Sequence, residues 1–275
     1  SGLVFKKNLE IIKTKEREYI KDLDLVELPS YDLIDINAYM EYTKKNDGFK
    51  AIPYMTSRGC PFSCIFCAVH CVMGSRLRQK SPRKVVDDIK KIIKRYDAEG
   101  IWFKDSTFTI DKGWIKEFCD IIKKENIYIK WKCNTRIDCV DEETIKIMKD
   151  AGLQGLWFGI ESGSRKILKV LKKNYDTTKI KETIDICKKN NVEVNSWMII
   201  GCPDESFEDI KASVRLAREL GLKSMHWHAL VPLPGSEIYK KLEKSFFEYD
   251  SLSFNKAVMD TGVLNKDQIQ CLLNQ

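Results

Sequence analysis

The chain has 275 residues, of which 43% are hydrophobic, and its 47 basic against 40 acidic side chains give a formal net charge of +7. This length and composition are typical of a soluble, globular protein with a sizeable core, built as one barrel-type domain or two ordinary ones. No window approaches eighteen consecutive apolar residues and no signal peptide is recognisable, so we expect neither a membrane span nor secretion.

The first 47 residues are predicted to form an N-terminal appendage. Ser1-Gly2 is typical of a tag remnant and the chain lacks an initiator methionine, so we expect it to have been taken from a longer protein. A small hairpin is predicted over Leu3 to Thr14, around Lys7-Asn8, and an extended acidic linker over Asp22 to Pro29.

From Ala51 onward, short β-rich runs alternate with amphipathic helical patterns, which indicates parallel β-α units. The predicted strands cover about residues 51–57, 100–105, 128–134, 155–161, 193–201 and 223–231. The predicted helices cover about residues 82–96, 111–125, 141–151, 164–190 with a break near Asn174, 204–220 and 236–244. Six units predict an α/β fold, a partial and open (β/α)6 barrel of the TIM type, over residues 48–245. Residues 246–275 form a C-terminal segment without a legible motif.

A cysteine-rich loop follows the first predicted strand, at the sheet edge where parallel α/β proteins place their sites. Cys60, Cys64 and Cys67 have the spacing C-x3-C-x2-C, which suits one iron–sulfur cluster and leaves one iron of a [4Fe–4S] cubane without a protein ligand. A zinc knuckle and a disulfide-rich surface loop are the alternative interpretations of these cysteines. Cys71 offers another, as the fourth ligand of a closed cluster in an electron-transfer or binding module. Most other cysteines lie in apolar-periodic segments, as free thiols of a reducing cytoplasm do.

This motif, with the aromatic Phe66 just before its last cysteine, resembles that of the radical S-adenosylmethionine (SAM) superfamily. The resemblance extends from about Ala51 to Tyr239, and the sequences of its other segments are most similar to those of the cobalamin-dependent branch, which contains many methyltransferases. It implies an enzyme whose [4Fe–4S] cluster is held by Cys60, Cys64 and Cys67 and chelated by SAM, with Cys71 as a spare. The implied reaction cleaves SAM reductively to a 5′-deoxyadenosyl radical, for methylation or another modification of an unactivated carbon.

Strand alternation predicts which side chains face the barrel lumen. On the fourth strand, the face that helices would cover carries Leu156, Phe158 and Ile160. Glu161 should therefore point into the lumen near its top, on the same face as Trp157. By the same argument Asn134 and Arg136 face the lumen from the third strand. A structural salt bridge between Glu161 and Arg136 is the bland alternative to a role in binding.

Two histidines, His226 and His228, share one face of the sixth predicted strand. They are weak catalytic candidates, since a metal pair, a general base and a polar lining of a wet lumen all fit this pattern. The fifth strand similarly offers Asn195, Trp197 and Gly201 to the lumen, whereas the second strand does not sort cleanly into two faces.

The family resemblance also implies residues that contact SAM. Gly159 to Gly163, which contains Glu161 and Ser162, resembles the fourth-strand motif that hydrogen-bonds the ribose. Gly201 and Pro203 resemble the fifth-strand motif that flanks adenine. The remaining implied contacts are Phe66, Asp105 and Ser106 in the place of a glycine-rich segment for the methionyl amino group, Asn134 and Arg136, and Lys173 in the place of an arginine for the carboxylate. Lysine cannot form the bidentate fork of arginine, and the glycines before Asp105 are missing.

The same resemblance implies a small-molecule or peptide substrate and a low-potential electron donor such as flavodoxin or ferredoxin. A basic cluster formed by Arg76, Arg78, Lys80, Arg83 and Lys84 is a candidate surface for an acidic donor or an anionic substrate. This cluster has no interleaved aromatic residues, so no nucleic-acid partner is expected. Cobalamin would require an upstream domain that 47 residues cannot supply; the alternative is a cobalamin-free radical SAM enzyme.

Overall fold

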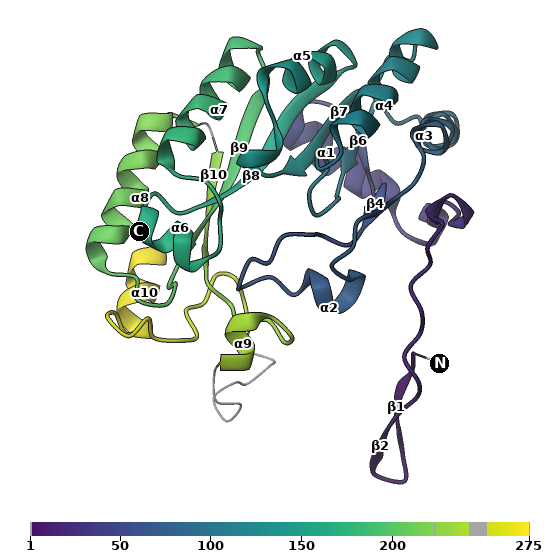
Figure 1. The fold of residues 1–275 in the computed structure, drawn as a ribbon. Coiled ribbons are helices and arrows are strands. Elements are labelled where there is room, and N and C mark those ends of the chain that lie inside the picture. Colours follow the sequence, from purple (N-terminus) through teal and green to yellow (C-terminus); the bar gives the residue numbers. More distant parts are fainter. Residues whose placement is uncertain (1, 223, 242–251, 275) are drawn as a thin grey trace.

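A six-stranded, all-parallel sheet forms the centre of the molecule in the computed structural model, which describes residues 2–222, 224–241 and 252–274 (Figure 1). The strand order is β10-β9-β8-β7-β6-β3. The strands are β3 (Ala51–Tyr54), β6 (Gly100–Phe103), β7 (Lys130–Thr135), β8 (Leu153–Glu161), β9 (Glu193–Ile200) and β10 (Ser224–Ala229). Within the described residues this order ends at β3 and β10 without closing on itself, and the parallel α/β sheet confirms the predicted fold class.

The helices between the strands cover one face of the sheet (Figure 1). They are α3 (Pro82–Tyr96), α4 (Lys112–Lys124), α5 (Glu142–Asp150), α6 (Arg165–Val170), α7 (Thr177–Lys189), α8 (Phe207–Leu220) and, after β10, α9 (Glu237–Lys241). The break predicted near Asn174 separates α6 from α7. Side-chain caps fix several starts: Ser81, Asp111 and Asp141 each accept a hydrogen bond from the backbone N–H three residues on. Residues 223 and 242–244 of the predicted elements lie outside the described residues.

The main hydrophobic core lies between the sheet and these helices. It contains the outward-facing residues of the strands, among them Ile101, Phe103, Trp131, Leu156 and Phe158, all fully buried. The alternation predicted for the fourth strand is therefore confirmed, and the second strand also sorts, with Ile101 and Phe103 outward. The opposite face of the sheet is left to line the lumen.

The N-terminal hairpin is confirmed as β1 (Val4–Lys7) and β2 (Glu10–Lys13), which pair with each other and project away from the body (Figure 1). Its turn lies at Asn8-Leu9, both with positive φ. The linker expected at Asp22 to Pro29 is not wholly extended, because it contains a 3-10 turn, η1 (Leu23–Leu25). The side chain of Asp22 caps that turn by accepting from the N–H of Asp24.

Helix α1 (Ile36–Asp47), which the sequence pattern did not predict, packs against β3. The side chain of Asp35 accepts from the N–H of Ala38, and Gly48 ends the helix in the left-handed conformation. Ile36 and Met40 belong to the main core, and so does Tyr31 of a second 3-10 turn, η2 (Tyr31–Leu33). The second half of the predicted appendage is thus built into the packed body.

The last described segment returns to the barrel through α10 (Lys266–Leu273), whose N-terminus has a capping box formed by Asn265 and Gln268. Ile269 of this helix is buried beside Gly201 at the end of β9. Of the helices described here, none has both the length and the apolar character needed to cross a membrane.

Candidate active site

The cysteine loop, residues 59–77, leaves the carboxyl end of β3 and is closed at its base by a two-stranded ladder. In this ladder β4 (Ser57–Arg58) pairs with β5 (Arg78–Gln79). Gly59 follows with φ 86°, and a Cβ added there would lie 2.2 Å from the carbonyl oxygen of Arg76, so only glycine fits. The N–H of Cys60 donates to the carbonyl of Gly74 (3.2 Å). These contacts hold the two ends of the loop together next to the carboxyl end of β3.

The three predicted cluster cysteines share this loop. Cys60 is buried, and Cys64 and Cys67 are half-buried. Burial raises the pKa of the Cys67 thiol, and the nearby Cys64 and Cys60 raise it further. In the described residues no three His, Cys, Asp or Glu side chains are gathered into a metal-ligand group, so cluster ligation stays a prediction. Three thiols on one loop are nevertheless the donor set that an iron–sulfur cluster takes.

Cys71 is placed differently from these three. It lies on the short helix α2 (Val69–Met73), is exposed, and its thiol donates to the carbonyl of Gly235 (3.3 Å). The backbone of Gly235 crowds it, because a Cβ on that glycine would lie 2.3 Å from the Cys71 sulfur. This side chain faces the turn after β10, which disfavours Cys71 as a fourth ligand of the same cluster.

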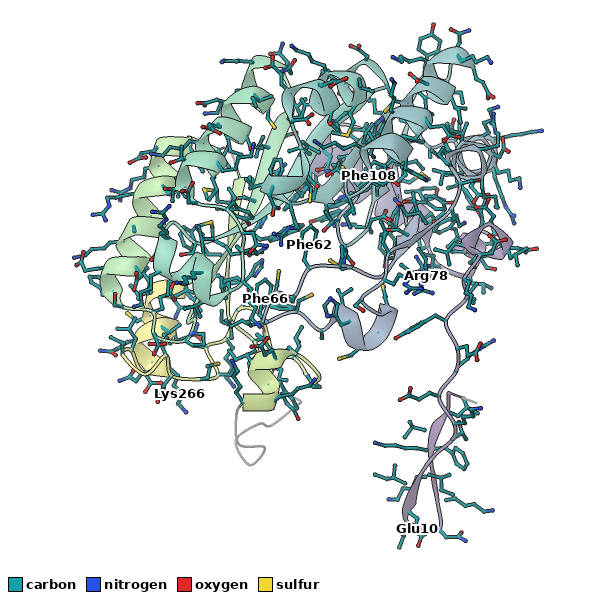
Figure 2. All side chains as sticks on the ribbon, in the orientation of Figure 1. Glu10, Phe62, Phe66, Arg78, Phe108 and Lys266 are labelled. Carbon is teal, nitrogen blue, oxygen red and sulfur yellow. The ribbon has the colours of Figure 1, made fainter. Side chains whose placement is uncertain are left out.

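Arg136, at the end of β7, connects the sheet to the loop. Its Nη1 donates to the Cys64 sulfur (3.4 Å), and its guanidinium lies 3.8 Å from the ring centre of Phe62. A two-pronged ion pair with Asp138 (2.8 Å for each hydrogen bond) holds it in place. Burial lowers the pKa of Arg136, but Asp138 more than offsets this, so the pKa is raised and the cation persists. Figure 2 shows Phe62 and Phe66 of the loop near the middle of the molecule.

Glu161 ends β8 at a register shift against β9 and has a left-handed φ of 67°. Its carboxylate accepts from the ammonium of Lys173 (2.9 Å), and both side chains are buried. The alternative pairing with Arg136 is therefore wrong: the register shift turns Glu161 toward Lys173, while Asp138 takes Arg136. A Cβ on Gly159 would lie 2.3 Å from the Glu161 carboxylate, so a larger residue there would require that carboxylate to move. Burial lowers the pKa of Lys173, but the charge of Glu161 reverses this and leaves it raised.

Asp105 and Ser162 have structural partners rather than free functional groups. Buried Asp105 accepts from the N–H (3.1 Å) and hydroxyl (2.9 Å) of Thr56 and from the hydroxyl of Ser57, and burial raises its pKa. It thus ties the end of β6 to the entrance of the cysteine loop. Fully buried Ser162 pairs with the hydroxyl of Ser213 (3.1 Å). These contacts favour positioning over the ligand contacts that the resemblance implies. Half-buried Ser106 accepts a hydrogen bond on its carbonyl from the hydroxyl of Thr107 (2.7 Å).

Gly201 has φ 91° and begins the loop after β9 that also contains Pro203. The carboxylate of Glu205 accepts from the N–H groups of Gly201 (2.6 Å) and Cys202 (3.1 Å) and so holds this turn. Burial raises the pKa of Glu205 to about 7. Sequence reasoning missed this role, although a glutamate four residues after a turn glycine was the available signal.

Polar groups on the lumen face are incompletely paired. The side-chain oxygen of Asn134 and Nδ1 of His228 are buried without a hydrogen-bond partner among the described residues. Burial lowers the pKa of His228, and His226 lowers it further. His226 is exposed, contacts the hydroxyl of Ser224 (2.8 Å), and its ring is stacked on Trp157. These contacts leave all three interpretations of the histidine pair open as predictions.

A cavity of about 380 Å³ brings several predicted site residues together. Its lining includes Phe66, Glu161, Trp197, His228, Leu230 and Phe254. Phe254 comes from the C-terminal segment and approaches the ring of His228 (5.8 Å between centres). No periodicity or motif marks that segment, so its part in the lining could not be predicted.

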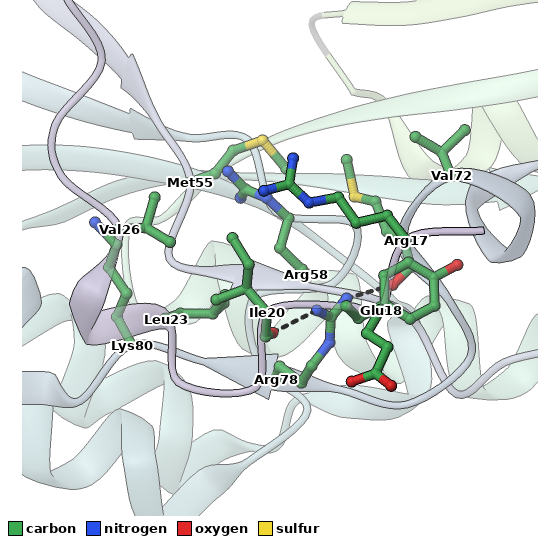
Figure 3. Close-up of a pocket in the computed structure, with 12 residues that line it drawn as sticks. Arg17, Glu18, Ile20, Leu23, Val26, Met55, Arg58, Val72, Arg78 and Lys80 are labelled. Atoms are coloured by element: carbon green, nitrogen blue, oxygen red, sulfur yellow. Dashed lines mark hydrogen bonds between the residues drawn. The ribbon is translucent and has the colours of Figure 1, made fainter. Parts of the chain in front are cut away.

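A second cavity, about 430 Å³, lies between the N-terminal segment and the cysteine loop (Figure 3). Arg78 spans it, donating to the carbonyls of Ile20 (2.7 Å) and Met73 (2.6 Å) under the ring of Tyr19. The basic cluster predicted here is largely paired: Lys80 and Lys84 both bind Asp88, and Arg83 binds Asp87 and Glu125. These pairs reduce its attraction for an acidic partner.

The radical SAM superfamily model matches residues 54–217. An uncharacterized methyltransferase of Pyrococcus horikoshii is 31% identical over 239 residues, 87% of this chain and 51% of that protein. The anaerobic magnesium-protoporphyrin IX monomethyl ester cyclase of Rubrivivax gelatinosus is 25% identical, over 94% of this chain and 47% of the relative. The chain thus spans about half the length of these curated relatives.

Two solved structures share the fold. The radical SAM methyltransferase TsrM from Kitasatospora setae, with cobalamin and a [4Fe–4S] cluster, has a TM-score of 0.64 at 18% identity, over 72% of this chain and 39% of that one. The cobalamin-dependent SAM radical enzyme OxsB, with aqua-cobalamin bound, has a TM-score of 0.66 at 19% identity, over 87% and 35%. With the family match over more than half of its residues, this chain belongs to the radical SAM superfamily of enzymes.

Proposed function

We propose that this chain is the core of a radical SAM enzyme in which Cys60, Cys64 and Cys67 hold a [4Fe–4S] cluster. The observation that carries the proposal is the position of the loop. Its three thiols lie at the carboxyl edge of a parallel sheet, where Arg136 donates to Cys64 and the Glu161–Lys173 pair lies beside Phe66. When bound, the cluster supplies the electron that cleaves SAM to methionine and a 5′-deoxyadenosyl radical.

The residues around the loop prepare the site for an anionic ligand set. Arg136 keeps a permanent positive charge beside Cys64, where it would lie next to the negative charge of a thiolate-ligated cluster. Asp105 fixes the loop entrance, and Glu205 fixes the turn that begins at Gly201. These three side chains position the loop and the strand ends without needing to touch SAM.

Glu161 and Lys173 are proposed to bind SAM together with Phe66, Asn134, Gly201 and Pro203. The two charged side chains form a buried ion pair, so SAM must share or replace that pair. A ribose hydroxyl would donate to Glu161 and a carboxylate would accept from Lys173, which keeps both charges compensated. Breaking the pair without such replacement would leave a buried charge alone, at a cost of about 3–5 kcal/mol.

The overall reaction is proposed to be methylation or another modification of an unactivated carbon, in the cytoplasm, on a small-molecule or peptide substrate. The names methyltransferase and cobalamin on the similar proteins support a corrinoid-dependent reaction. Residues 1–47, 48–245 and 246–275 are proposed as the linker region, the barrel and the C-terminal segment, although residues 31–47 pack with the barrel. Cobalamin would then be held by a part of the protein outside this chain. A low-potential flavodoxin or ferredoxin would supply the electron.

Anaerobic reconstitution tests this proposal against a closed electron-transfer cluster. Cys60→Ala, Cys64→Ala or Cys67→Ala should abolish the intact cluster because each removes a thiolate, whereas Cys71→Ala should keep about four irons per chain. Adding SAM to the reduced, loaded chain should change its electron paramagnetic resonance spectrum. An unchanged spectrum at full loading, or iron loss in Cys71→Ala equal to that in the other three, would establish the closed cluster instead.

A further inference from the structure

Four aromatic rings form a continuous row across the lumen face of the sheet. Trp102 of β6 contacts Trp157 of β8 (5.7 Å between ring centres), which contacts Trp197 of β9 (4.9 Å) and His226 of β10 (5.0 Å). We call Trp102, Trp157, Trp197 and His226 the aromatic row. Its rings come from four of the five strands between β6 and β10, which puts flat apolar faces along the lumen side of the sheet.

The tryptophans of this row differ from those of the outer core in their hydrogen bonding. On the helix-covered side, the indole N–H of Trp114 donates to the carbonyl of Lys80 (2.7 Å), and that of Trp131 to the carbonyl of Ala151 (2.8 Å). The indole nitrogens of Trp102 and Trp157 are buried and have no hydrogen-bond partner among the described residues. The whole side chain of Trp157 is buried as well, with 9% of its surface exposed. Buried indole N–H groups usually find an acceptor. Packing alone therefore does not account for the row.

Three polar side chains, those of Lys104, Lys132 and His226, lie over the faces of these indoles, and the ammonium of Lys132 is 4.3 Å from the ring centre of Trp102. The ammonium of Lys104 is 2.8 Å from the ring centre of Trp102, and the exposed His226 ring stacks on Trp157 at an interplanar angle of 27°. Lys132, on the neighbouring strand, is paired with Asp47. In the part of the chain that the structure describes, no carboxylate lies within ion-pair distance of Lys104. Burial lowers the pKa of Lys104 to about 8 and the charge of Lys132 lowers it further, whereas the charge of Asp47 opposes this shift.

A cavity of about 440 Å³ opens at the Trp102 end of the row. Its walls are almost entirely apolar and include Tyr39 and Tyr42 of α1, Pro53 of β3, Trp102 and Lys104. This volume is that of a site for a small organic ligand. The other end of the row, at Trp197, borders the cavity that contains Phe66 and Glu161. The row therefore joins an apolar pocket with one cation to the proposed SAM site.

We propose that this pocket and row bind the substrate, and that the substrate is a flat aromatic or heteroaromatic ring system with an anionic substituent. The ring stacks on the indoles of Trp102 and Trp157 in place of the polar side chains that cover them. The anionic group pairs with Lys104, since the described residues place no carboxylate within ion-pair distance of its ammonium. This inference rests on the proposed function, since it names the substrate class for that site.

Equilibrium dialysis of the purified chain with three matched probes tests the inference. The probes are naphthalene-2-carboxylate, its neutral carboxamide and cyclohexanecarboxylate, which separate ring stacking from charge. The carboxylate of naphthalene should bind at least about tenfold more tightly than either of the others, because each lacks one of the two interactions. It should also quench tryptophan fluorescence. Equal binding of all three probes, or no saturable binding of the naphthalene carboxylate, overturns the proposal.

Variants locate the site. Lys104→Met should weaken the naphthalene carboxylate about tenfold and leave the carboxamide unchanged, and Lys104→Arg should retain binding. Lys130→Met is the matched control, because Lys130 also lies over an aromatic ring, that of Phe49 at 5.9 Å, but away from this cavity. Equal losses in Lys104→Met and Lys130→Met overturn the assignment. If Lys104→Met does not fold, as judged by circular dichroism, the carboxylate-to-carboxamide ratio of the unmodified chain decides.

The titrations contain no SAM and need no turnover. A chain that binds the probes but shows no response to SAM keeps this inference and loses the proposed reaction. A chain that responds to SAM but does not discriminate among the probes keeps the reaction and loses the substrate class.

Discussion

The carboxyl of Glu205 makes the stability of this fold depend on pH in a direction that can be worked out. Its Oε2 accepts from two backbone N–H groups, while its Oε1 is buried without a partner among the described residues. Burial raises the pKa from the ordinary value of 4.5 to about 7, although the two N–H groups oppose the shift. A carboxyl with a raised pKa binds more protons in the folded than in the unfolded chain. Its stabilising contribution is therefore complete below the unfolded pKa and is lost as the pH rises through the folded one.

The size of the effect follows from the two pKa values. A shift from 4.5 to about 7, at 1.36 kcal/mol per unit, corresponds to about 3 kcal/mol of unfolding free energy lost on ionisation. Glu205→Gln keeps an uncharged oxygen that can accept both hydrogen bonds and removes the titration. We therefore expect the variant to be more stable than the unmodified chain by about 2–3 kcal/mol near pH 8, and no more stable near pH 5.

Urea unfolding at a series of pH values, followed by tryptophan fluorescence, measures this difference. Glu208→Gln is the matched control, since Glu208 lies in the first turn of α8, is exposed and pairs with Lys211 (2.8 Å). The stability difference between the unmodified chain and Glu205→Gln should change across the window from about pH 5 to pH 8, and that of the control should not. A flat difference for Glu205→Gln, or the same slope for both variants, would refute the reasoning.

Two further predictions concern the loop and the ion pair. Gly59→Ala should lower iron loading and reduce the free energy of unfolding by about 1–3 kcal/mol, because its Cβ would meet the carbonyl of Arg76. The control Gly48→Ala is also at positive φ but has open space around its Cβ. It should reduce the free energy of unfolding by about 1 kcal/mol and leave iron loading unchanged. Iron analysis and urea titration check both, and equal loading in the two variants would contradict the clash. Glu161→Gln should weaken SAM binding by about 1.5–3 kcal/mol in calorimetry with the cluster intact, and unchanged affinity would remove Glu161 from the site. The same variant leaves Lys173 buried without its partner, so Glu161→Gln with Lys173→Met should recover stability but not SAM affinity.

Periodicity and capping were sufficient to predict most of the barrel. Leu156, Phe158 and Ile160 occupy every second position of the strand, and a period of two residues places them on one face. Asp111 and Asp141 predict helix starts because their side chains accept hydrogen bonds from backbone N–H groups of the first turn. Such signals involve residues that are close together in the sequence, so they can be recognised in a single sequence.

Contacts between distant segments were much less predictable. The partner of Glu161 is Lys173 rather than Arg136 because of a register shift at the end of β8, and strand alternation assumes that no such shift occurs. Helix α1 carries both a cap at Asp35 and a stop at Gly48, yet its weakly apolar sequence resembles a linker. Phe254 reaches the lumen from a segment with no pattern of its own. In each case the deciding interaction joins residues that spacing does not relate.

The position of the cysteine loop depends on contacts from several strands at once, and this affects how variants should be interpreted. Asp105 anchors the loop entrance to β6, the β4–β5 ladder closes its base, and Arg136 reaches Cys64 from β7. Loss of iron after a change at Asp105 or Arg136 would therefore not identify a cluster ligand, because displacement of the loop would have the same effect. A ligand is distinguished by losing iron while the unfolding free energy stays unchanged. Cys67, half-buried on the loop, meets that condition more readily than Asp105, whose carboxylate holds the entrance together.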